Sequence, residues 1–141
     1  MNANVFISTT GQGLARAACN ASGEWPVELL LQGREITCLA ADPLAPGVVY
    51  AGTRSSGVLR SDDRGQTWHS AGLDGHVIKS LAASPLEPGL IYAGTKPPMI
   101  FVSRDKGANW SERDSFRQMR RWFWYTPAEP GAPYVQAIAL S

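Results

Sequence analysis

The sequence has little cysteine, no excess of charge of one sign and no long hydrophobic run. Cys19 and Cys38 are its two cysteines, too few for a disulfide scaffold, and without CxxC spacing or a nearby histidine cluster they predict no metal site. Thirteen Lys and Arg against twelve Asp and Glu leave a net charge of +1, which gives no electrostatic case for binding nucleic acid or an anionic membrane. No apolar run approaches the roughly 20 residues of a membrane span.

The first residues, MNANVFISTTGQG, also lack the basic and apolar regions of a signal peptide. We therefore expect two reduced thiols in a cytoplasmic protein; a secreted protein that misses its leader is the alternative. No Ser-His-Asp set or phosphate-binding loop is found, and no cofactor is expected.

An internal repeat dominates what is present. Residues 40–53, AADPLAPGVVYAGT, and residues 82–95, AASPLEPGLIYAGT, are identical at ten of fourteen positions, at an offset of 42. The same offset carries SDDRGQTW (61–68) onto SRDKGANW (103–110). A weaker copy precedes them: residues 5–16 resemble 48–60, but CNASGEW (19–25) has neither the Asp nor the Gly in register. A further copy begins at 134–141, where YVQAIALS overlays VIKSLAAS (77–84).

Each full unit contains four short β-prone runs separated by turn residues. In the second unit they are Ile36–Ala41, Val48–Thr53, Val58–Ser61 and Trp68–Ala71. Apolar residues fill much of the first two runs, as in strands buried on both faces. Four strands repeated at this spacing are typical of a β-propeller blade, and a solenoid of β-hairpins is the structural alternative.

The pattern S-x-D-x-G-x-x-W in 61–68 and 103–110 resembles the Asp box (BNR repeat) of sialidases, sortilin-type receptors and photosystem II assembly propellers. The resemblance implies an all-β propeller and says little about activity. The Asp side chains can accept hydrogen bonds from their own turn, the Gly allows positive φ, and the Trp can pack under the hairpin. We therefore predict a structural and not a catalytic role for Ser61, Asp63, Gly65, Trp68, Ser103, Asp105, Gly107 and Trp110.

Ligand binding is expected on the face opposite the boxes. In propellers, loops from the fourth strand to the next blade share a face with loops between the second and third strands. Here these loops are 32–35, 54–57, 73–76, 96–98 and the stretch from 115 to 133. The candidate binding residues in the first four loops are Arg34, Arg54, His76 and Lys96.

The stretch 116–133, FRQMRRWFWYTPAEPGAP, breaks the repeat, because the next first strand arrives 57 residues after the previous one and not 42. Long loops on a repeat scaffold are where function concentrates. Rings beside guanidinium groups suit stacking on sugars or bases, or anchoring a protein partner. The alternative is that the rings plug the channel or pack on the next blade, with the arginines solvated. The candidate binding residues here are Arg120, Arg121, Trp122, Trp124 and Tyr125.

Two functions stay open. The first is a non-catalytic propeller that binds a glycan or protein ligand or assists assembly. The second is a sialidase-like glycoside hydrolase or lyase whose site is completed by other blades; Arg120, Arg121, Tyr125 and Glu129 are a poor imitation of such a site, because in the family the equivalent groups converge from several blades.

The strand count predicts an incomplete ring. We expect a single propeller part over 1–141: second to fourth strands of a first blade in 5–31, a second blade in 36–73, a third in 77–115, an inserted loop at 116–133 and a closing first strand at 134–141. Closed propellers have about 4 to 8 blades, so three cannot close. Either the chain is part of a longer protein, or two copies related by a two-fold axis form a six-bladed ring.

Overall fold

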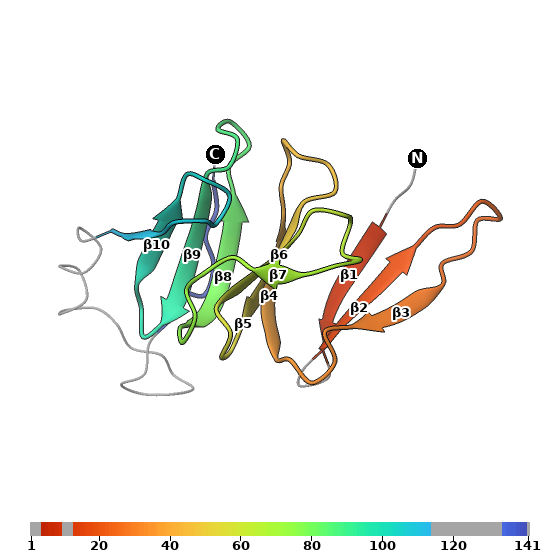
Figure 1. Ribbon diagram of the computed structural model, residues 1–141, viewed down its shortest axis with the longest axis horizontal. Coiled ribbons are helices and arrows are strands. Elements are labelled where there is room, and N and C mark those ends of the chain that lie inside the picture. The colour runs from red at the N-terminus through yellow and green to blue at the C-terminus, as the bar shows by residue number, and fades with distance from the viewer. Residues whose placement is uncertain (1–3, 10–12, 114–133, 141) are drawn as a thin grey trace.

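The computed structural model describes residues 4–9, 13–113 and 134–140, and in these residues every regular element is a β-strand. Eleven strands form three antiparallel sheets that stand side by side in chain order, like sectors of a fan (Figure 1). The fold class expected from the repeat, an all-β propeller fragment, is confirmed.

Each sheet is a meander in which every strand pairs with the next one along the chain. The N-terminal sheet contains β1 (Asn4–Thr9), β2 (Gly13–Ala18) and β3 (Val27–Leu30). The middle sheet contains β4 (Ile36–Ala41), β5 (Val49–Thr53), β6 (Val58–Ser61) and β7 (His69–Ser70). The C-terminal sheet contains β8 (Val77–Ala83), β9 (Ile91–Lys96), β10 (Ile100–Ser103) and β11 (Ser111–Glu112).

Burial explains why the second strand of a unit is so apolar. All five residues of β5 are buried, because β5 has hydrogen-bonded neighbours on both edges and another sheet against both faces. The outermost strands β7 and β11 have only two residues each, and β7 is exposed throughout. A blade is therefore most buried in its second and third strands and most exposed at its outermost strand.

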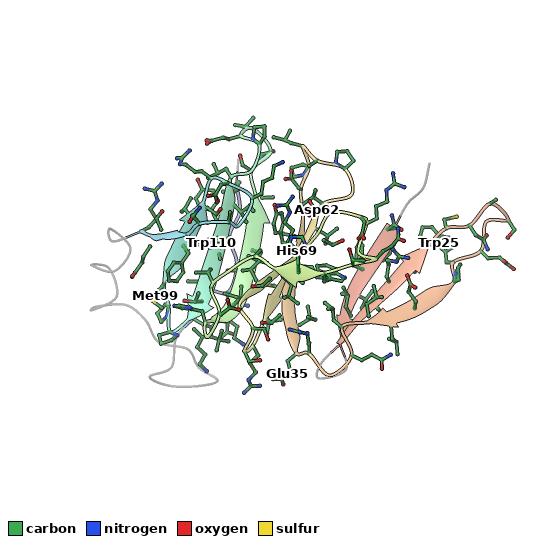
Figure 2. The ribbon with its side chains drawn as sticks, in the orientation of Figure 1. Trp25, Glu35, Asp62, His69, Met99 and Trp110 are labelled. Carbon is green, nitrogen blue, oxygen red and sulfur yellow. The ribbon has the colours of Figure 1, made fainter. Side chains whose placement is uncertain are left out.

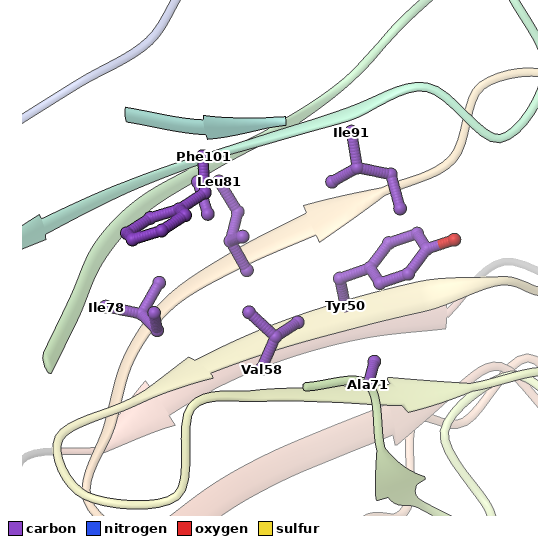
Figure 3. Packing of buried hydrophobic residues seen from close by; sticks show 8 residues of the cluster. Tyr50, Val58, Ala71, Ile78, Leu81, Ile91 and Phe101 are labelled. Atoms are coloured by element: carbon purple, nitrogen blue, oxygen red, sulfur yellow. The ribbon is translucent and has the colours of Figure 1, made fainter. Parts of the chain in front are cut away.

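Two apolar seams hold the sheets together. The seam between the N-terminal and middle sheets is built on Leu14, Ile36, Ala51 and Leu59, with Phe6, Leu39 and Trp68 packed against them. The seam between the middle and C-terminal sheets is larger (Figure 3), and its buried residues are Tyr50, Val58, Ala71, Ile78, Leu81, Ile91, Ala93 and Phe101.

Residues 134–140, in the segment where the closing strand is expected, form no ladder with another described strand. They nevertheless pack on the C-terminal sheet: the backbone N–H of Val135 donates to the carbonyl of Thr95 at 3.2 Å, and Ser80 Oγ donates to the carbonyl of Val135 at 3.0 Å. Strand geometry needs a ladder on a neighbouring strand, and the described residues offer none on the far side of this segment.

Candidate functional site

The turns 61–68 and 103–110, here called the box turns, are organised around one carboxylate each. Asp63 Oδ1 accepts from the backbone N–H groups of Gln66 and Thr67, both at 2.8 Å, and Asp63 Oδ2 accepts from the Thr67 hydroxyl at 2.6 Å. Ser61 Oγ donates to Asp63 Oδ1 and accepts from the backbone N–H of Gly65 at 2.7 Å. The side chains are therefore fully engaged with their own turn.

The second box turn repeats this network. Ser103 Oγ accepts from Gly107 N–H at 2.8 Å and donates to Asp105 Oδ1 at 2.8 Å, while Asn109 donates to both oxygens of Asp105. Side-chain and backbone donors of Asn109 lower the pKa of Asp105 to about 2, and the Thr67 hydroxyl and N–H hold the pKa of Asp63 still lower. Both carboxylates are therefore held in the charged form by hydrogen bonds.

The N-terminal sheet keeps an equivalent of the box turn that the sequence pattern hid. Asn20 Oδ1 accepts from the backbone N–H of Glu24, four residues on, at 2.8 Å, and from Ser22 N–H at 3.1 Å. Asp105 has the same bond to the residue four positions later. The Asp absent from this copy is thus replaced by Asn20, because a neutral amide oxygen can accept the same turn donors.

The box turns also join neighbouring sheets. A side-chain carbon at Gly65 would collide with the Phe6 ring of the preceding sheet, and one at Gly107 would lie 2.9 Å from Ala71 Cβ. Trp110 Nε1 donates to the carbonyl of Ala71 at 2.7 Å as well as to its own turn at Gly107. The Trp expected to pack under its own hairpin therefore also closes the seam to the sheet before it.

In each seam an arginine side chain also connects the two sheets. Arg16 on β2 donates to the carbonyl of Arg64 at 2.8 Å, and Arg60 on β6 donates to the carbonyl of Lys106 at 3.4 Å. Both acceptor residues, Arg64 and Lys106, are non-glycine residues with φ near +61°, a backbone conformation that is uncommon for such residues. The box turns are thus hydrogen-bonded to side chains of the neighbouring sheets.

At the other end of the strands, the structure brings together part of the predicted binding face. The Arg54 guanidinium lies 3.4 Å from Glu35 Oε1, and the Arg54 N–H donates to the Glu35 carbonyl at 3.0 Å. Arg34 is exposed in the same β3–β4 loop as Glu35. Figure 2 places Glu35 at the lower edge of the middle sheet, away from Asp62 of the box turn. This loop edge carries exposed charges of both signs.

His76 and Lys96 lie in the corresponding loops of the C-terminal sheet. His76 is half-buried, with its ring edge-on to Phe101 at 5.0 Å between ring centres and its Nδ1 buried. Lys96 ends β9 and precedes the cis peptide bond to Pro97. His76, named from the sequence as a candidate binding residue, therefore packs against a residue of the seam.

The predicted aromatic and arginine stretch lies outside the described residues, including Arg120, Arg121, Trp122, Trp124 and Tyr125. Among the residues that are described, no group of His, Cys, Asp and Glu is arranged to hold a metal ion. Burial raises the pKa of the Cys38 thiol to about 11, so it is not poised as a nucleophile. Within the described parts of the chain there is also no helix long and apolar enough to cross a membrane.

A contact between a basic and an aromatic side chain, from β8 to residue 134, was not predicted from the sequence. Lys79 Nζ lies 5.1 Å from the ring centre of Tyr134, a distance at which an ammonium is attracted to a ring face. Lys79 interrupts the pairing of β8 with β9. In the sequence, only the overlay of 134–141 on 77–84 points to this contact between Lys79 and Tyr134.

Comparisons with known proteins support the fold. No family model and no curated protein sequence matches the chain. Among solved structures, the chain is similar to YCF48 bound to D1 peptide, with a TM-score of 0.60 and 17% identity over 76% of this chain and 36% of that one. It is also similar to the GH74 xyloglucanase from Xanthomonas campestris, with a TM-score of 0.63 and 23% identity over 82% of this chain and 20% of that one. The chain therefore spans about a third and a fifth of these propeller proteins.

Proposed function

We propose that this chain is part of a non-catalytic β-propeller of the Asp-box type that binds a protein segment on the edge formed by the loops 32–35, 54–57, 73–76 and 96–98. The observation that carries the proposal is the exposed charge at this edge, where the Arg54 guanidinium lies 3.4 Å from Glu35 Oε1 beside the exposed Arg34. Donors of their own turns lower the pKa values of Asp63 and Asp105. Neither is therefore the acid that a glycosidase needs, one whose pKa is raised so that it holds a proton at neutral pH.

The loop edge suits a polar protein ligand. Arg34 and Arg54 are exposed, and the carboxylate of Glu35 forms an ion pair with Arg54 at 3.4 Å. An exposed pair of this kind contributes little to folding, so its charges are available to a ligand that carries both signs. The similarity to YCF48 bound to D1 peptide adds a propeller of the same fold that holds a peptide.

The alternative is a glycoside hydrolase whose catalytic groups come from blades outside the described residues. The similarity to the GH74 xyloglucanase favours it. A screen of polysaccharides, xyloglucan included, separates the two functions: release of reducing sugar supports the enzyme, and none is expected. A displayed library of random peptides should instead give enriched binders.

A matched pair of variants tests the binding edge. Arg34→Ala with Arg54→Ala should weaken binding of an enriched peptide by roughly 10-fold or more, since each charge-assisted hydrogen bond is worth about 1.5–3 kcal/mol. Arg104→Ala, an exposed arginine in the box turn paired with Glu87, should leave binding unchanged. Peptides that lose affinity equally in both variants would contradict the proposed edge.

The proposal includes self-association. Three blades are fewer than the roughly 4 to 8 of closed propellers, and two copies would supply six. Self-association would use the apolar faces of the sheets, and ligand binding would use the loop edge. The two proposals can therefore be tested separately.

A further inference from the structure

The outer face of the N-terminal sheet is apolar and uncovered among the described residues. Val5, Ile7, Val27 and Leu29 are exposed to 45%, 56%, 67% and 55%, and Trp25 to 45%. The strand register places them in two rows across the sheet, Val5–Ala17–Val27 and Ile7–Ala15–Leu29. Exposed apolar patches of this extent mark interaction sites.

The two internal seams show what such a face binds. By register, Ile7 and Ala15 pair as Ala51 and Leu59 do in the middle sheet and as Ala93 and Phe101 do in the C-terminal sheet. Ala51 and Leu59 are buried against Leu14 of the preceding sheet, and Ala93 and Phe101 against Tyr50 and Val58. The face that carries Ile7 is thus the one a preceding blade covers.

The position of Trp25 also indicates that a preceding blade covers this face. It matches Trp68 and Trp110, each of which packs into the seam to the sheet before it. Its own exposure follows from the lack of such a sheet in the described chain.

Residues 134–140, near the other end of the chain, lie where the first strand of a further blade would be. Ile78 of β8 packs on the middle sheet, where its Cγ2 would lie 2.7 Å from a side-chain carbon added at Gly52, and Thr37 Oγ1 donates to its carbonyl. Val135 repeats this on the C-terminal sheet: its Cγ1 would lie 2.5 Å from a side-chain carbon at Gly94, and Ser80 Oγ donates to its carbonyl. Residues 134–140 therefore occupy the place of a first strand in the next blade.

That next blade needs second to fourth strands, and the N-terminal sheet is such a set. β1 pairs only with β2 among the described strands, so its other edge is open. We propose that residues 134–140 of one copy pair with the free edge of β1 of a second copy, whose Ile7 face then docks on the C-terminal sheet of the first. The exchange is reciprocal and closes a ring of six four-stranded blades. This inference rests on the proposed self-association and is independent of the ligand.

A difference in the seam contacts identifies the occupant as a second copy. Both internal seams contain an arginine that donates to a box-turn carbonyl, at Arg16 and Arg60. The register puts Val102 at this position of the C-terminal sheet, opposite Tyr92 as Arg60 is opposite Tyr50. In the loop 19–25, the place of Arg64 is taken by Ala21, which lacks the positive φ of Arg64 and Lys106. Of the two surfaces that would meet, one thus lacks the arginine donor and the other lacks the backbone conformation of the acceptor residue.

The mass in solution tests the inference. Light scattering behind a sizing column should give about twice the chain mass of 15.2 kDa. Ile7→Glu and Leu29→Glu, each at a position exposed in the single chain, should raise the dissociation constant on the order of 100-fold with unchanged circular dichroism. Leu86→Glu is the matched control, because Leu86 is 81% exposed outside this face.

Crosslinking tests the strand register. Ile138 overlays Leu81, which pairs with Ala93, so it should lie opposite Ile7 of the other copy. Opposite residues on antiparallel strands are about 4.5–5.5 Å apart at Cα, within disulfide reach. Ile7→Cys with Ile138→Cys, in a Cys19→Ser background, should therefore give a covalent dimer on oxidation, and Ile7→Cys with Leu86→Cys should not.

The outcomes are distinct. A monomer overturns both the exchange and the proposed self-association. A dimer that is insensitive to Ile7→Glu, or that does not crosslink through Ile7→Cys and Ile138→Cys, overturns the exchange and leaves self-association standing. Peptide binding measured on the Ile7→Glu variant reports on the binding edge alone.

Discussion

At the residue scale, the box turns show how one short polar side chain fixes a turn. Ser103 is 1% exposed, and its hydroxyl links Gly107 N–H to the Asp105 carboxylate. Asp105 itself lies at the surface and satisfies donors that would otherwise face one another unpaired. The same role is filled by an amide at Asn20, so the turn requires an acceptor oxygen and does not require a charge.

The charge should nevertheless add a pH-dependent part to stability. The pKa of Asp105 is about 2 in the folded chain and about 3.9 when unfolded. Its contribution is therefore present above the unfolded value and is lost as the pH falls through the folded one. Asp105→Asn should lower the urea midpoint at pH 7, and the difference from wild type should shrink between about pH 5 and 2. Asp74→Asn, an exposed carboxylate outside the box turns, is the control; a constant difference at Asp105 would contradict the argument.

Glycine at 52 is required by close packing and not by backbone conformation. A side-chain carbon there would collide with Cys38 Sγ and lie 2.7 Å from Ile78 Cγ2, in the seam to the C-terminal sheet. Gly52→Ala should therefore destabilise by about 1–3 kcal/mol, the usual cost of overpacking. Cys38→Ala in the same chain should recover part of that loss, which urea unfolding of the single and double variants would measure. Strictly additive losses would contradict the collision.

At the element scale, the sheets are joined by apolar seams and by one arginine each. Arg16 is anchored on both sides: it donates to the carbonyl of Arg64 in the next sheet and pairs with Glu28 in its own. The Arg16 side chain is only 14% exposed, while that of Glu28 is half exposed.

Removing this anchor should loosen the first seam. We expect Arg16→Met, which keeps the apolar stem, to cost about 1–3 kcal/mol in the free energy of unfolding, because a hydrogen bond from a charged donor is lost. Arg104→Met is the matched control; its pair with Glu87 is exposed, and such pairs are worth at most about 1 kcal/mol. Urea unfolding measures both variants. Equal losses in the free energy of unfolding would mean that the effect comes from removing a positive charge and not from breaking the seam contact.

The strands were predictable because their signal is local and repeated. Val58–Ser61 and Ile36–Ala41 have the bounds expected from the repeat. The fourth strand was shorter than the expected Trp68–Ala71, because Trp68 leaves the ladder to pack against the N-terminal sheet. Contacts between sheets, such as Arg16 to Arg64, join residues far apart in the sequence and leave no local pattern. Asn20 was not predicted, because the sequence motif requires Asp at this position. The turn itself requires only a side-chain oxygen that accepts hydrogen bonds.

The candidate site was less predictable than the fold. Arg54 and Glu35 meet because the loops 32–35 and 54–57 end neighbouring strands of one sheet, which the strand pattern implied. The half-burial of His76 depends on Phe101, on a strand reached only after another hairpin, and no spacing rule predicts it.

At the scale of the whole molecule, the three sheets of the described residues form an arc (Figure 1). The outer face of the N-terminal sheet is apolar and exposed among these residues. In the proposed ring this face is buried by the second copy, together with the open edge of β1. Folding and association would then be linked, because the dimer buries what the single chain exposes.

This linkage makes thermal stability depend on concentration. For a chain of this length, unfolding enthalpies per residue predict that the midpoint rises by about 2–3 °C for each tenfold increase in protein, since dissociation accompanies unfolding. Differential scanning calorimetry across a hundredfold range of concentration measures it. Ile7→Glu should have a lower midpoint that does not move with concentration, because it carries a charge on the seam face and unfolds as a monomer. Leu86→Glu should follow the wild type. A wild-type midpoint that stays constant across the range would show that folding is complete in the single chain.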